Sequence, residues 1–157
     1  MRLPGRSILK KQLSSGLERN KMKKKFLTLL TLAPLALCSC EASSYSALML
    51  ITSKRTTTGS ISFSAFEGQY VFKLKRTEEG EGTIKYTASL EEGHMEVLYK
   101  ATMMDEYEKM FDISGGETRD GYMGYLEKGY KVTIIVRSDG KAATGSFTFD
   151  TNYDLNQ

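Results

Sequence analysis

The only histidine of this 157-residue chain, His94, is the first candidate for chemistry. As a general base it would need a nucleophile and an orienting carboxylate nearby in space. No serine stands in a Gly-x-Ser-x-Gly pattern, the signature of a strained nucleophile turn. Because His94 directly follows Gly93, at the start of an expected strand, we interpret it as an exposed turn residue and predict no catalytic residue.

Four carboxylates lie close together in the chain, at Asp105, Glu106, Glu108 and Asp112. Paired carboxylates hydrolyse glycosides when they lie about 5–9 Å apart across a cleft. A small domain that needs one face of every strand for its core rarely builds such a cleft. We therefore interpret the cluster as a solvated acidic turn, and keep a small secreted hydrolase as an alternative function.

Three oxygen-bearing side chains alternate near the end of the sequence, at Asp150, Asn152 and Asp154. A calcium loop begins with the same alternation. It then needs a glycine, where this chain has Leu155, and a distal glutamate, which this sequence does not supply. We interpret the segment as a frayed polar C-terminus and predict neither a metal site nor a cofactor.

The best candidate for ligand binding is the segment Gly121-Tyr122-Met123-Gly124-Tyr125. Glycines flank two tyrosines and a methionine, which favours accessible rings that stack on a sugar or line a peptide groove. The alternative is that Tyr122 and Tyr125 pack on opposite faces of a twisted strand, with a glycine marking a bulge. The absence of Trp disfavours a sugar-binding face, because Trp offers the largest stacking surface.

The elements that must position these residues follow a period of two. Apolar and polar residues alternate over several segments, and Gly-containing turns such as Asp139-Gly140 separate them. Both prolines lie at or before residue 34. The spacing predicts an all-β fold, a single antiparallel β-sandwich of about seven to nine strands. The alternating segments are 61–65, 70–75, 84–90, 95–100, 131–137 and 147–149.

Two stretches interrupt or precede this pattern. Met103–Met110 is the one stretch that suits a helical turn, with Thr102 or Asp105 as its cap. Ala47–Ser53 is apolar and is interpreted either as a first strand or as the end of a tether. The final segments, Gly129–Ile134 and Gly145–Phe149, are similar to the endings of jelly-roll and GOLD-type sandwiches, and that resemblance supports the fold alone.

Charge is distributed unevenly along the chain. Nine of the 22 Lys and Arg residues, but only one of the 19 acidic residues, precede residue 26. Residues 26–157 therefore carry 13 basic and 18 acidic side chains, a formal net charge of −5. No basic patch remains that would favour nucleic acid, so we predict no nucleic-acid partner.

An export signal lies between Met22 and Cys40. Three lysines precede an apolar run over 26–37, which is too short for a membrane span of about 20 residues and contains Pro34. This stretch predicts a signal peptide helix ahead of the sandwich. Residues 1–21 fit no signal peptide, and a start codon assigned too early or a disordered extension explains them.

The end of this segment resembles the lipobox of bacterial lipoproteins. With Cys40 as the lipid acceptor, Leu37 stands at the aliphatic position and Ser39 at the small one, whereas Cys38 would place Leu37 where a small residue is needed. The resemblance implies lipidation of Cys40, with a secreted protein cut near Ala42 as the rival. It divides the chain into a signal peptide (22–39), a lipidated Cys and tether (40–59) and a sandwich domain (60–157).

These observations together predict a lipid-anchored protein on the extracytoplasmic face of the cell membrane. Its partners would be the membrane, through the N-terminal lipid, and an envelope protein or a glycan. The expected role is non-catalytic binding or structural support. A carbohydrate-binding module that uses Tyr122 and Tyr125 is the first alternative.

Overall fold

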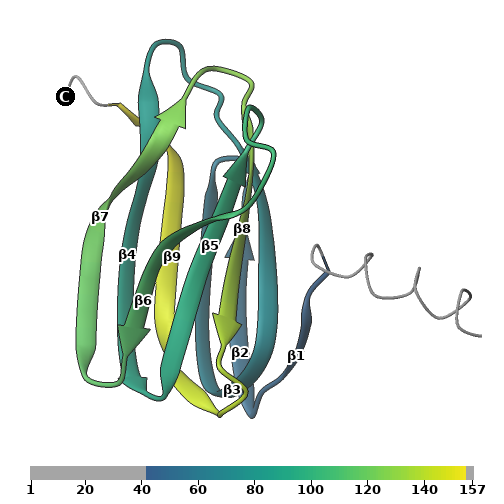
Figure 1. The fold of residues 1–157 in the computed structure, drawn as a ribbon, viewed down its shortest axis with the longest axis vertical. Coiled ribbons are helices and arrows are strands. Elements are labelled where there is room, and N and C mark those ends of the chain that lie inside the picture. The colour runs from purple at the N-terminus through teal and green to yellow at the C-terminus, as the bar shows by residue number, and fades with distance from the viewer. Residues whose placement is uncertain (1–41, 155–157) are drawn as a thin grey trace, which may run out of the picture. The chain divides into compact units, whose positions relative to one another are not determined.

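The computed structural model describes residues 42–154, which form nine strands and no helix. The prediction of an all-β antiparallel sandwich is confirmed (Figure 1). The predicted signal peptide helix and Cys40 lie outside the described residues. No helix in the described range has the length and apolarity needed to span a bilayer. The strands are β1 (Ser44–Ser46), β2 (Met49–Lys54), β3 (Thr58–Lys75), β4 (Gly82–Glu92), β5 (His94–Ala101), β6 (Glu108–Ser114), β7 (Glu117–Leu126), β8 (Lys131–Ser138) and β9 (Ala143–Asp154).

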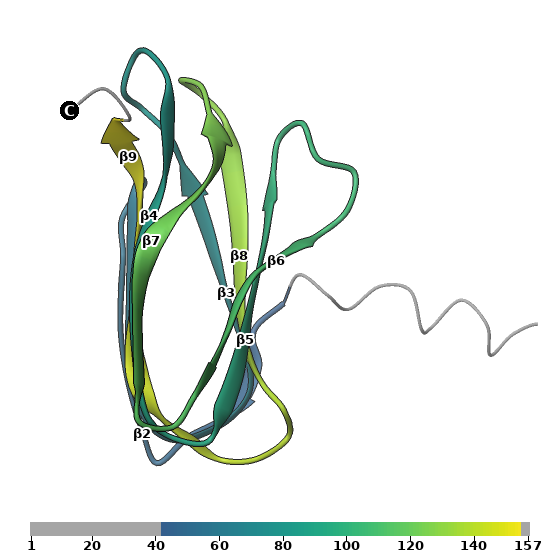
Figure 2. The same ribbon diagram turned by 60° about the vertical axis from the view of Figure 1, so that its left-hand side comes forward.

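The strands form two layers that share one strand. Sheet A has the order β6-β5-β8-β3-β1, and sheet B has the order β2-β3-β9-β4-β7, with every pair antiparallel. The two layers face each other across the core, as Figure 2 shows. Glycines occupy tight turns between strands. Gly93 and Gly140 have φ angles of 90° and 86°, which residues with a side chain disfavour.

Strand β3 passes from sheet B to sheet A at a sharp bend. Ala65 has a φ of 49° and Gly68 a φ of 113°, and the register with β9 shifts between Phe63 and Phe66. Bulges of this kind let one strand turn a sandwich corner. The first half of β3 thus belongs to sheet B and the second half to sheet A.

The domain begins earlier than the sequence predicted. Strand β1 pairs with β3 at Ser44–Ser46, and β2 pairs with β3 over Met49–Lys54. The predicted tether over 40–59 therefore contains two strands of the sandwich. All but one of the residues of β1 and β2 are exposed, so these strands lack the buried alternation by which the other strands were predicted. Of the two interpretations of Ala47–Ser53, the structure shows a strand from Met49 on.

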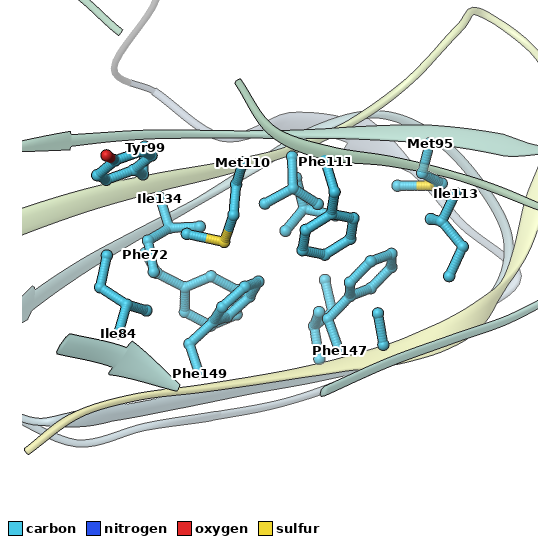
Figure 3. Close-up of a cluster of buried hydrophobic side chains, with 14 of the residues drawn as sticks. Phe72, Ile84, Met95, Tyr99, Met110, Phe111, Ile113, Ile134, Phe147 and Phe149 are labelled. Carbon is cyan, nitrogen blue, oxygen red and sulfur yellow. The ribbon is translucent and has the colours of Figure 1, made fainter. Parts of the chain in front are cut away.

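Phenylalanines from both sheets fill the core (Figure 3). Phe111 of β6 stacks on Phe147 of β9, with centroids 6.3 Å apart, and Phe72 of β3 meets Phe149 at 5.6 Å. Phe63 stacks on Phe147 at 5.8 Å within sheet B. Each of these rings is at least 94% buried, and burial of large apolar side chains contributes about 1.5–3 kcal/mol apiece.

Two local expectations are corrected. The stretch Met103–Met110 forms no helical turn: a loop with a hydrogen bond from Met104 N to Ala101 O leads into β6 at Glu108. The C-terminal segment is a paired part of β9 instead of a frayed end, since Asp154 lies opposite Gly82. At the C-terminal segment, strand pairing with distant residues overrides the local preference, whereas Met103–Met110 is the connection of the β5–β6 hairpin and the start of β6.

Candidate binding surface

The outer face of sheet B carries an array of hydroxyl side chains. In β3 and β9, large apolar residues point into the core and small hydroxyl residues alternate with them. The strand register aligns the hydroxyls in rows across the sheet. One row is Ile51, Ser62, Ser146, Ser89 and Thr118, and the next is Ser53, Ser60, Thr148, Thr87 and Asp120.

A shallow depression of about 260 Å³ lies on this array. We define the hydroxyl face as the array together with this depression. Within it, the hydroxyls of Thr87 and Thr148 form a hydrogen bond with each other. The outward side chains that line the depression are Ser53, Thr58, Ser60, Lys85, Thr87, Thr148 and Asp150.

A carboxylate and an ammonium stand beside the hydroxyls. Asp150 lies opposite both Thr58 and Lys85 in the strand register. One oxygen of Asp150 accepts a hydrogen bond from the backbone N–H of Asn152 at 2.8 Å, and a carboxylate has the capacity to accept several more. The depression thus offers hydrogen-bond donors, acceptors and one charge of each sign.

An aromatic pair from β7 and β9 lies next to Lys85, outside the lining of the depression. The rings of Tyr122 and Tyr153 lie 4.7 Å apart at 33°, and their hydroxyls hydrogen-bond at 3.2 Å. The Nζ atom of Lys85 lies 4.7 Å from the centre of the Tyr153 ring. The hydrogen bond to Tyr153 is the main cause that raises the pKa of Tyr122. Tyr122 is 51% exposed and therefore open to a ligand.

Tyr125 lies beyond a bulge in β7. The register with β4 shifts between Gly82 and Ile84, and Gly124 has a φ of 74°. The Tyr125 hydroxyl contacts the carboxylates of Glu81 and Glu127 at 3.4 and 3.3 Å. Partial desolvation and these acids raise its pKa. Tyr122 and Tyr125 thus have separate partners, and only Tyr122 adjoins Tyr153.

His94 does not stand in a catalytic arrangement within the described residues. It lies half-buried in the first position of β5, opposite Ser114 of β6, and not in an exposed turn as the sequence suggested. Glu117 is near enough for the histidine to contribute slightly to its lowered pKa, whose main cause is the backbone hydrogen bond from Ser114. Among residues 42–154, His94 has no hydrogen bond to a serine or a carboxylate.

The residues of the predicted acidic cluster likewise have separate interaction partners. Glu108 accepts a hydrogen bond from the Tyr99 hydroxyl at 3.2 Å, and Asp112 pairs with Lys109 at 3.0 Å. The backbone oxygen of Asp105 accepts from Lys100. No group of three or more potential metal ligands occurs in the part of the chain that the structure describes.

Asn152, one of the three alternating polar residues near the end of the sequence, forms hydrogen bonds within the fold. The Asn152 side chain accepts from the N–H of Thr77 at 2.9 Å and donates to the Thr77 hydroxyl at 2.8 Å. It also donates to Glu78 at 3.3 Å. Asn152 thereby ties the end of β9 to the loop after β3, which is not the ligand arrangement of a calcium loop.

Sequence reasoning missed Tyr153 and the hydroxyl rows. A local signal was present, because Ser60, Ser62 and Ser64 occupy every second position of one strand. Such positions on five strands become a continuous surface only through the strand register. The contact of Tyr153 with Tyr122 joins β9 to β7, which do not pair directly.

Comparison with solved structures finds only distant similarity, at 13–17% sequence identity, to proteins that include carbohydrate-binding modules. No protein-family model and no curated protein matches the chain. A family 29 carbohydrate-binding module in complex with mannohexaose aligns with a TM-score of 0.37 and 15% identity, over 71% of this chain and 83% of that one. The Podospora anserina GH26-CBM35 β-(1,4)-mannanase aligns with a TM-score of 0.40 and 13% identity, over 73% of this chain and 27% of that one. Likeness at this level assigns neither a family nor a ligand to this chain.

Proposed function

We propose that this protein is a non-catalytic module that binds a neutral glycan on the hydroxyl face of sheet B. The observation that carries the proposal is the depression, which is lined by hydroxyls, one carboxylate and the ammonium of Lys85, with the Tyr122–Tyr153 pair next to Lys85. Pockets for small ligands combine apolar or aromatic surface with a few converging polar groups. A sugar ring presents both kinds of surface, apolar C–H groups on its faces and hydroxyls on its rim.

Each group of the site has a role in this proposal. The Asp150 carboxylate accepts hydrogen bonds from sugar hydroxyls, and bonds to a charged acceptor are stronger than neutral ones. The hydroxyls of Thr87 and Thr148 act as donor or acceptor. The exposed ring of Tyr122 provides the stacking surface at the edge of the depression.

The ligand is neutral because the charges of the depression balance. Lys85 and Asp150 lie opposite each other in the strand register, so neither sign dominates the depression, and Asp120 adds a second carboxylate to the face around it. An acidic ligand would meet Asp150 and also the −5 net charge of residues 26–157. We therefore expect binding that depends weakly on ionic strength.

The proposal includes the lipid anchor expected from the sequence. Lipidation of Cys40 would hold the domain outside the cell membrane, close to envelope or extracellular glycans. Mass spectrometry of the full chain from a bacterial host, beside a Cys40→Ala variant, tests this part. A diacylated N-terminal Cys40 supports the anchor, whereas a free N-terminus near Ala42 overturns it and leaves the glycan proposal standing.

Affinity electrophoresis in gels that contain soluble neutral polysaccharides tests the binding role. We expect at least one neutral polysaccharide to retard the wild-type chain, and Tyr122→Ala to weaken binding about tenfold, equal to about 1.4 kcal/mol. Tyr125→Ala is the matched control, because that residue is equally exposed but contacts Glu81 and Glu127. Equal loss in both variants, or no retardation by any neutral polysaccharide, would contradict the proposal.

A further inference from the structure

An apolar strip runs along the edge where the chain enters the sandwich. We define the edge patch as Tyr45, Leu48, Met49 and Ile51, which are 45%, 87%, 50% and 62% exposed. These residues belong to β1, β2 and the link between the two strands. The Tyr45 ring also stacks on Phe66 at 5.6 Å, so Leu48, Met49 and Ile51 supply most of the free apolar surface. Exposed apolar side chains gathered at one edge are typical of an interaction surface.

The same edge presents unpaired backbone groups. Strand β2 has β3 as its neighbour on one side, and on its other side no strand of residues 42–154 pairs with it. Proteins protect such edges with Lys, Pro or other charges. Residues 44–53 contain no proline and no charged residue, so Lys54, at the end of β2, is the one protecting charge on this edge strand.

The geometry points to a second copy of this chain as the occupant: two β2 strands pair antiparallel about a two-fold axis and join two sheets B into one. The edge of another strand would pair with the open N–H and C=O groups of β2. A hydrocarbon surface would leave those groups unpaired, at a cost of several kcal/mol. An isologous contact also closes on itself, so it yields a dimer and no fibre.

Side-chain pairing suits this arrangement. If Ile51 lies opposite Ile51 of the second copy, Met49 and Ile51 stay on the outer face, and apolar side chains meet across the axis. The pairing also directs Lys54 and Arg55 of one copy toward the corner of the other copy, where Glu67 lies exposed beside Ser46. Opposite charges therefore meet at both ends of the contact.

The two-fold axis also fits the proposed function, on which this part of the inference rests. Ala42 and Ser43 follow the half of β3 in sheet A, through bonds to Gln69 and Val71. An axis perpendicular to sheet B keeps both chain entries on the sheet-A side. Both hydroxyl faces then lie on the side opposite Ala42 and Ser43, next to each other in a continuous sheet.

The contact is small and its affinity modest. Six residues at about 3.3 Å each give an edge about 20 Å long, which places the interface among the weak, transient class. Two anchored copies on one membrane have a high effective concentration, which favours pairing. The pairing would give one glycan chain two adjacent sites.

Sedimentation equilibrium of the full chain in density-matched detergent tests this proposal. We expect reversible dimers, and we expect Ile51→Lys to raise the dissociation constant at least about tenfold, since it places like charges opposite each other. Thr118→Lys is the matched control, because it adds the same charge to the same row of the face at the other edge. Circular dichroism and thermal unfolding verify that both variants fold.

A photo-crosslinking residue at position 51, such as Ile51→benzoylphenylalanine, identifies the occupant in intact cells. A product of twice the chain mass supports the second copy. A monomer at all concentrations, a dimer insensitive to Ile51→Lys, or a crosslink to lipid or to another protein overturns the proposal. Polysaccharide retardation of the wild-type chain is measured separately from its sedimentation without polysaccharide, so failure of glycan binding and failure of dimerisation are distinguishable.

Discussion

The ring of Phe72 occupies the space into which a side chain at Gly59 would project. A Cβ atom built on Gly59 would lie 2.6 Å from Cδ1 of Phe72 and 2.9 Å from its Cε1. Both residues belong to β3, one in its sheet-B half and one in its sheet-A half. The two halves of β3 therefore pack against each other across the core. The two sheets lie this close together there because Gly59 has no side chain.

Gly59→Ala is expected to destabilise the fold by about 1–3 kcal/mol, the usual cost of overpacking a filled core. Phe72 is fully buried between Tyr70 and Phe149, so its ring has no free space to enter. Urea denaturation measures the free energy of unfolding. Ser62→Ala, on the outer face of the same strand, should change it by no more than about 0.5 kcal/mol, and equal effects in both variants would refute the packing argument.

The buried guanidinium of Arg76 closes one end of the sandwich. Its Nη1 donates to the carbonyls of Thr151 and Tyr153 at 3.2 and 3.1 Å, and its Nη2 donates to that of Glu79 at 3.3 Å. Arg76→Met would keep the aliphatic stem and leave these carbonyls without their donor. We expect a loss of about 3 kcal/mol.

Hydrogen exchange distinguishes this role from a general packing effect. Amide protection should fall first at the end of β9 and in the loop that follows β3, where the guanidinium acts. Arg119→Met, whose side chain is 47% exposed and pairs with Glu117, should alter the free energy of unfolding by about 0.5 kcal/mol at most. A uniform loss of protection over all strands would speak against the local role of Arg76.

Glu96 gives the stability of sheet A a dependence on pH. It forms ion pairs with Arg137 and Lys109, and the hydrogen bond from Arg137 is the main cause that lowers the pKa of Glu96 below 4.5. A pKa lowered by folding stabilises the native state above the unfolded-state pKa. That stabilisation is lost as pH falls through the lower, folded-state pKa.

Glu96→Gln should therefore matter at neutral pH and not in acid. Near pH 7 we expect the variant to unfold with a free energy lower by up to about 1 kcal/mol, and we expect the difference to vanish at a pH below the folded-state pKa. Urea titrations at several pH values measure it, because urea adds no screening salt. A difference that persists unchanged in acid would mean that packing, and not charge, causes it.

Local alternation predicted the strands but not their connections. Val132–Val136 and Ile84–Leu90 lie within β8 and β4, as the period of two indicated. The segments around Phe63 and Phe72 were predicted as separate strands, and they are one strand of 18 residues. At this bend the strand changes its neighbours but continues to form backbone hydrogen bonds. The local sequence does not distinguish such a bend from a turn.

For the candidate site, too, the sequence indicated single residues but not their neighbours in space. Exposure of Tyr122 follows from neighbouring glycines, which the sequence shows directly. Its partner Tyr153 lies 31 residues away, and the depression joins β2, β3, β4 and β9. Such a surface is set by the register of four strands, and each register depends on side-chain packing in the core. Residue types alone do not specify it.

The charges of the depression give the last prediction, which concerns how the ligand is held. Asp150→Asn replaces a charged acceptor by a neutral one of the same shape, so we expect polysaccharide affinity to fall about tenfold. Lys85→Met keeps the aliphatic stem beside the Tyr153 ring and should change affinity less than about threefold, since a neutral glycan needs no ammonium. Calorimetric titration in low and high salt measures both variants.

Salt dependence separates this arrangement from binding of an acidic polymer. A neutral ligand predicts nearly the same affinity at low and high ionic strength, because screening acts on charge pairs. If Lys85→Met abolished binding and Asp150→Asn strengthened it, with affinity falling steeply as salt rises, the ligand would be anionic. Asp150 would then oppose binding, and the depression would act through its one cation instead of through its hydroxyl rows.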